Sequence, residues 1–110
     1  MVLARPSVLG RWARVVQAVA RMGVARFEDL HVWQHAKRLC DEIGSLLARP
    51  TFVRHAPLSR QLDAAAISTV ANIAEGFLRR DGKDFARFVR IAAASNGEAR
   101  ALLYAAEGRA

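Results

Sequence analysis

Apolar residues recur at spacings of three and four along three separate stretches of the chain, which is the period of an amphipathic α-helix. The first stretch covers about residues 29–48 and the third runs from about residue 82 to 107, with a heptad-like apolar seam. The second, about residues 58–78, is apolar nearly all round. A helix of that kind is normally contacted on several sides. The pattern therefore predicts an all-α protein whose second long helix lies in the middle.

Helix-breaking residues separate these stretches. Pro50 and Pro57 bracket the first connection, which we expect to be a loop that reverses the chain and turns Phe52 and Val53 toward the core. Asp81 stands just before the third stretch, where an N-cap residue belongs. Short connections of this kind predict an antiparallel, up-and-down helical bundle.

The first 26 residues form a distinct basic segment with five Arg and no acid. Beyond Pro6 the pattern predicts an amphipathic helix that ends near Gly23. Three interpretations stay open: the helix packs on the main domain, lies on an anionic membrane surface, or reflects a start site that truly falls at Met22. We therefore divide the chain into an N-terminal extension, residues 1–26, and a helical-bundle domain, residues 27–110. The predicted apolar side of the extension consists of Val8, Trp12, Val15, Val16 and Val19.

Composition adds limits to this picture. A chain of 110 residues suffices for one domain with one core. Of the net charge of +7, the first 26 residues supply +5 and the remainder +2, so the overall charge is weak evidence for a nucleic-acid partner. Cys40 is the single cysteine, which leaves no intrachain disulfide. The chain has no uninterrupted apolar run typical of a signal peptide or membrane span, and we expect a cytoplasmic protein.

Candidate metal and catalytic groups are sparse. His31 and His35 have the spacing of a zinc-binding helix, but the acidic residue that follows the first His in such helices is missing, and His55 is the only further histidine. Asn72 and Glu75 stand three residues apart in the apolar second stretch, without a nucleophile, a phosphate-binding loop or a second carboxylate near them in sequence. We expect no metal, no cofactor, no small-molecule substrate and no enzymatic activity.

A row of polar residues on the second helix favours a structural interpretation instead. At about 100° per residue its members fall within an arc of about 60°, and buried polar groups need partners from a neighbouring helix. We expect a polar ladder between the second and third helices. Its predicted members are Gln61, Ser68, Asn72, Glu75, Ser95 and Glu98, with Asn96 as a further candidate.

The densest cationic cluster of the main domain lies at the turn before the third helix and on that helix. Two acids, Asp81 and Asp84, interrupt it, and a charge run on a helix is often only its solvated face. The alternative is a surface that meets phosphates. The cluster consists of Arg79, Arg80, Lys83, Arg87 and Arg90.

Three segments together resemble a known family. FEDLHVWQHAKRL, QLDAAAISTVANIAEG and DFARFVRIAAASNGEA are similar to the four-helix-bundle proteins first noticed as products of the 23S ribosomal RNA intervening sequence, relatives of the accessory variability protein of diversity-generating retroelements. The resemblance covers about residues 27–106. It implies an up-and-down bundle that forms a homo-oligomer, typically a pentamer, without enzymatic activity, and that binds RNA, DNA or a reverse transcriptase through a basic surface.

The chain departs from the family pattern in three ways. Gly44 replaces a usual aromatic residue, Asn96 replaces an apolar one, and the chain stops before the family's fourth helix. We therefore expect a truncated bundle with an open seam, which the extension helix is suited to fill. Three functions stay open: a non-catalytic oligomer that binds nucleic acid or a nucleic-acid enzyme, a protein-interaction scaffold without a nucleic-acid role, and, third, a membrane-peripheral role through the extension.

Overall fold

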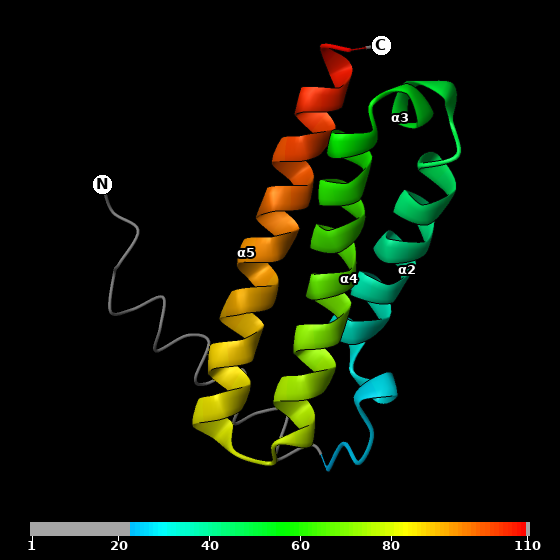
Figure 1. Ribbon diagram of the computed structural model, residues 1–110. Coiled ribbons are helices and arrows are strands. Elements are labelled where there is room, and N and C mark those ends of the chain that lie inside the picture. The colour runs from blue at the N-terminus through cyan, green and yellow to red at the C-terminus, as the bar shows by residue number, and fades with distance from the viewer. Residues whose placement is uncertain (1–22, 110) are drawn as a thin grey trace.

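The computed structural model describes residues 23–109, which form helices and turns and contain no strand. This confirms the predicted all-α class, and the three long helices begin and end within a few residues of their predicted bounds. The extension helix predicted before Gly23 lies outside the described residues. In chain order the elements are η1 (Phe27–Asp29), α2 (His31–Leu46), α3 (Pro50–Arg54), α4 (Ala56–Leu78) and α5 (Gly82–Glu107) (Figure 1).

The helix α4 occupies the middle of the molecule, as its apolar composition predicts. It packs along its length against α5 on one side and against α2 on the other, whereas α2 and α5 contact each other little (Figure 1). The result is a flattened arrangement with Cα extents of 46 × 35 × 17 Å. The core therefore lies along the two flanks of α4.

Two clusters of buried side chains make up that core. One lies near the α4–α5 turn and includes Ile73, Phe77 and Phe85, with the two phenylalanine rings edge to face at 5.9 Å between centroids. The other lies toward the opposite end and is centred on Leu62, which is fully buried. Full burial of a leucine side chain contributes about 1.5–3 kcal/mol.

The connection between α2 and α4 differs from the expected loop, because it contains the one-turn helix α3. Pro50 begins this helix, a position where proline costs nothing since the first helical N–H has no intrahelical acceptor. Phe52 turns into the core as predicted, but the prediction for Val53 is wrong: this side chain is 67% exposed. A helical turn sends the two neighbouring side chains in directions about 100° apart, so both cannot face the core.

The predicted N-cap of α5 is confirmed. The Asp81 carboxylate accepts hydrogen bonds from the backbone N–H groups of Lys83 at 2.8 Å and Asp84 at 3.3 Å. These bonds satisfy donors that have no partner within the helix, which is worth about 1 kcal/mol. Among residues 23–109, no helix is long and apolar enough to span a membrane.

Candidate nucleic-acid interface

The polar row on α4 forms a hydrogen-bonded group at its centre. The hydroxyl groups of Ser68 and Ser95 lie 2.8 Å apart and join α4 to α5. The side-chain amide of Asn72 donates to the Ser68 carbonyl at 2.8 Å and to the Ser68 hydroxyl at 3.0 Å. All three side chains are half-buried. This part of the predicted ladder connects two helices.

The outer members of the predicted ladder do not take part in it. Glu75 lies at the surface and pairs with Arg79 of its own helix at 3.1 Å. Gln61 and Glu98 are exposed, and within residues 23–109 neither makes a side-chain hydrogen bond to the facing helix. The prediction of cross-helix partners for these three residues is therefore wrong. Each side chain reaches water instead, so no partner is needed.

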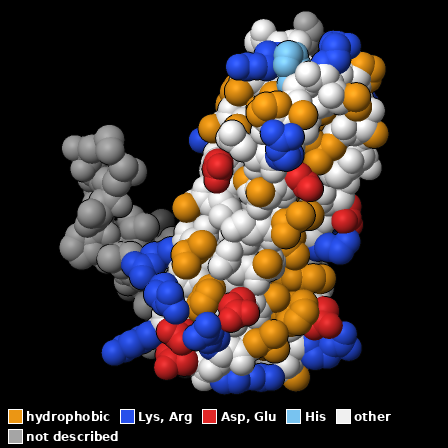
Figure 2. All heavy atoms as spheres, in the orientation of Figure 1, with side chains coloured by type: hydrophobic (Ala, Val, Ile, Leu, Met, Phe, Trp, Pro, Cys, Tyr) orange, Lys and Arg blue, Asp and Glu red, His pale blue; other side chains and the backbone are white. Residues whose placement is uncertain are grey.

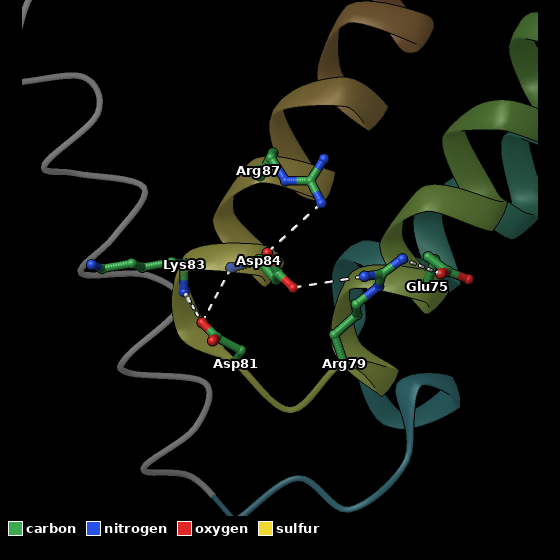
Figure 3. A network of polar contacts seen from close by, with 6 residues as sticks. All are labelled: Glu75, Arg79, Asp81, Lys83, Asp84 and Arg87. Carbon is green, nitrogen blue, oxygen red and sulfur yellow. Dashed lines mark hydrogen bonds and ion pairs between the residues drawn. The ribbon is translucent and has the colours of Figure 1, made fainter.

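The predicted cationic cluster contains an ion-pair network at the α4–α5 turn (Figure 3). Arg79 lies between Glu75 and Asp84, 3.1 Å from the first carboxylate and 3.8 Å from the second. Arg87 approaches Asp84 at 3.7 Å. Exposed ion pairs of this kind contribute only about 0.2–1 kcal/mol each. They nevertheless compensate much of the charge of Arg79 and Arg87 before any phosphate arrives.

Aromatic rings hold the same arginines in place. The guanidinium groups of Arg79 and Arg87 lie 4.9 and 4.6 Å from the centre of the Phe88 ring. Arg80 lies 5.2 Å from the Phe77 ring and donates a hydrogen bond to the Ala25 carbonyl at 3.1 Å. A guanidinium over an aromatic face gains about 0.5–1 kcal/mol at exposed sites. These three arginines thus have structural partners within the chain.

The other two predicted residues, Lys83 and Arg90, differ from them. Figure 3 shows the Lys83 side chain extending away from the ion-pair network. In the part of the chain that the structure describes, neither Lys83 nor Arg90 forms an ion pair with an acidic side chain. Both lie exposed on α5. They are the members of the cluster whose charge is available to a ligand.

The outward side of α5 extends this pair with two residues that the sequence analysis did not select. Arg100 and Tyr104 fall within the same arc of about 100° as Lys83 and Arg90, and Tyr104 is 68% exposed. Asp84 and Glu98 lie well outside the arc, and Glu107 lies just beyond its edge, about 20° from Arg100. A helical projection continued beyond the turn would have found these residues, whereas local charge density pointed only to the turn. We call Lys83, Arg90, Arg100 and Tyr104 the basic face of α5.

The visible surface shows where charged side chains of both signs gather. Lys and Arg side chains mix with Asp and Glu at the end of the molecule where α4 and α5 are joined, and less charged surface follows along the helices (Figure 2).

Among residues 23–109, no three His, Cys, Asp or Glu side chains are grouped as ligands of a metal ion would be. His31 and His35 both lie exposed on α2.

Fold and surface together define a small all-α protein of three long packed helices, one of which carries an outward basic face. Comparison of the sequence with known protein families identifies the family of this chain. The chain belongs to the 23S rRNA-intervening sequence protein family, whose model matches residues 28–110. No curated protein and no solved structure shows significant similarity to the chain.

Proposed function

We propose that the protein is a non-catalytic nucleic-acid-binding protein that contacts phosphates through the basic face of α5. The observation that carries this proposal is the exposure of three cationic side chains and one tyrosine along one helix face, with Glu107 at its edge as the nearest acid. Cationic side chains neutralise phosphates, and an exposed aromatic ring offers a base a surface on which to stack. The family name links these proteins to an RNA gene, so RNA is the first probe.

A non-catalytic role is supported by the polar row on α4. Ser68, Asn72 and Ser95 bond to one another, and Glu75 is held by Arg79. A general base or nucleophile needs a free approach to substrate and a partner that tunes it. In the polar row, these groups instead join α4 to α5 or form contacts within α4.

The test is the salt dependence of binding to a fluorescent single-stranded RNA of mixed sequence. Each phosphate contact on a single strand contributes about 0.7 to the slope of log affinity against log salt concentration. Replacing Lys83, Arg90 and Arg100 by Gln should therefore weaken binding and lower the slope by about 2. The loss of affinity in the triple variant should not depend on the RNA sequence, because phosphate contacts carry no sequence information.

A matched control variant has the same net charge as the triple variant but loses its three charges elsewhere in the molecule. Arg49, Arg54 and Arg60 lie exposed on and around α3, outside α5, and their replacement by Gln removes the same three charges. We expect this control to keep most of the affinity and slope. Equal losses in the two triple variants would show a non-specific effect of net charge and would reject the basic face as the binding surface.

A protein-interaction role is the second candidate, and exposed apolar side chains on α4 favour it. Ile67 is 52% exposed and Leu78 is 58% exposed, and both lie on the side of α4 turned away from its buried face. Self-association into a homo-oligomer is the form of this interaction that we propose. Light scattering tests it: Ile67→Asp should lower the mass in solution, whereas Val53→Asp on α3 should not. A monomeric wild-type protein would rule self-association out.

A further inference from the structure

An apolar groove of about 360 Å³ lies between α2 and α5, with α4 as its floor. Its walls are formed by Val32 and Leu39 on α2 and by Val89 and Ala92 on α5, and its floor by Ile73. Ile73, Val89 and Ala92 belong to the buried core near the α4–α5 turn. The groove is thus an opening into the core rather than a hollow of the outer surface. Packed helical domains normally cover such a face with another element.

The described chain begins near the α4–α5 turn, at one end of the core cluster onto which this groove opens. Val24 packs against the same core cluster, and the Ala25 carbonyl is held by Arg80 at the α4–α5 turn. Figure 1 shows this start beside that turn. Gly23 has a φ of +67°, a conformation that suits glycine and reverses the chain direction. The described chain therefore begins close to the core cluster onto which the groove opens.

The preceding segment has the length and pattern that the groove requires. Residues 7–22 would form a helix of about 24 Å, the same length as α2 with its 16 residues. Val8, Trp12, Val15 and Val19 share one side of that helix. The connection from Gly23 to Leu30 falls within the range usual between neighbouring antiparallel helices. A helix placed this way runs antiparallel to both α2 and α5.

We propose that residues 7–22 form an amphipathic helix that docks in the groove between α2 and α5 of the same chain and closes a four-helix bundle. The apolar side of the helix covers Ile73 and Ala92, and its arginines face solvent. Val15, about two turns from the point of entry, packs close to Ala93 on the groove wall. The docked helix would lie beside the basic face of α5, because Ala93 on the groove wall falls between Arg100 and Tyr104 in the helical projection. The tests below use no nucleic acid, so their results do not depend on the proposed function.

Disulfide trapping in the full-length chain tests this arrangement. In a Cys40→Ser background, Val15→Cys, Val16→Cys and Val19→Cys are each combined with Ala93→Cys, which lies on the groove wall. The matched control places the second cysteine one residue along as Ala94→Cys, which is also exposed but does not line the groove. Mild oxidation should trap an intramolecular bond in at least one Ala93→Cys pair and at least tenfold less in every Ala94→Cys pair.

Each alternative occupant gives a different result. Disulfides that link two chains would show that the groove receives the segment of a second copy and would overturn the proposal. Equal trapping with both partners, or none in any pair, would also overturn it. As a second measurement, Val15→Asp in the full-length chain should increase hydrogen exchange at residues 89–93, while Gln17→Asp, on the opposite side of the predicted helix, should leave this exchange unchanged. Unchanged exchange in both variants contradicts docking.

Discussion

Gly76 of α4 faces Phe88 of α5 so closely that a Cβ on the glycine would lie 2.6 Å from the Cβ of the phenylalanine. The same added atom would lie 3.2 Å from the Phe85 ring and 3.4 Å from the Phe85 Cα. The two helices therefore approach at a point where only hydrogen fits. Because Phe88 also supports Arg79 and Arg87, this approach positions the ion-pair network at the turn.

Gly76→Ala should destabilise the protein by up to about 2 kcal/mol. Overpacking costs about 1–3 kcal/mol, and the better helix propensity of alanine returns about 1 kcal/mol. Gly97→Ala on α5 is the control, since no atom lies within 4 Å of its added Cβ. That variant should gain about 0.5–1 kcal/mol. Urea unfolding of both variants measures the difference, and similar stabilities would contradict the close approach.

The long helices could be predicted because their signal is local. The apolar stripes of α2 and α5 and the all-round apolarity of α4 are visible in the order of residues alone. The α3 turn was missed because prolines at residues 50 and 57 read as breakers, although proline is favoured in the first turn of a helix. The role of Gly76 was missed as well, since only the crossing of two helices shows what its Cβ would meet.

The Ser68–Ser95 contact should stabilise the α4–α5 pair by about 0.5–1.5 kcal/mol. The single variants Ser68→Ala and Ser95→Ala and the double variant form a thermodynamic cycle that isolates this contribution. Ser68→Ala should cost more than Ser95→Ala, because it also removes the bond from Asn72 at 3.0 Å. Chemical denaturation checks the cycle. A coupling energy near zero would show that the hydroxyl pair does not join the helices.

The candidate site could be predicted only in part, because pairing is a three-dimensional property. The sequence placed Arg79, Lys83 and Arg90 in one cluster, and the structure separates them by their partners: Glu75 and Asp84 hold the first. The polar row failed in a similar way. Its members share one side of α4, but the distance of each side chain from α5 could not be predicted. That distance decides whether a side chain bonds to α5, as Ser68 does to Ser95, or faces water.

A comparison of two replacements of Arg80 should reveal the strain of its backbone. Its φ of 57° lies in the left-handed region, which costs a residue with a Cβ about 1 kcal/mol relative to glycine. Arg80→Ala and Arg80→Gly both lose the bond to the Ala25 carbonyl and the contact with Phe77. Arg80→Gly should therefore be more stable than Arg80→Ala by about 1 kcal/mol. Thermal unfolding of the pair decides this, and an equal or lower stability for glycine would contradict the left-handed conformation.

Cys40 should react slowly with iodoacetamide at neutral and mildly alkaline pH. Burial, followed by the charges of Asp41 and Asp63, raises the pKa of its thiol, and only the thiolate is nucleophilic. The comparison is a Cys40→Ser/Gly44→Cys variant, whose thiol stands one helical turn away at an exposed position with no atom within 4 Å of its Cβ.

The pH profile of alkylation separates the pKa from simple access to the thiol. The midpoint for Cys40 should lie above the ordinary cysteine value of about 8.5, and that for Gly44→Cys should lie close to it. Because the folded state holds the thiol proton more tightly, the stability linked to Cys40 is complete below the unfolded-state pKa and is lost as pH rises through the folded-state pKa. Identical midpoints for the two thiols would contradict the raised pKa.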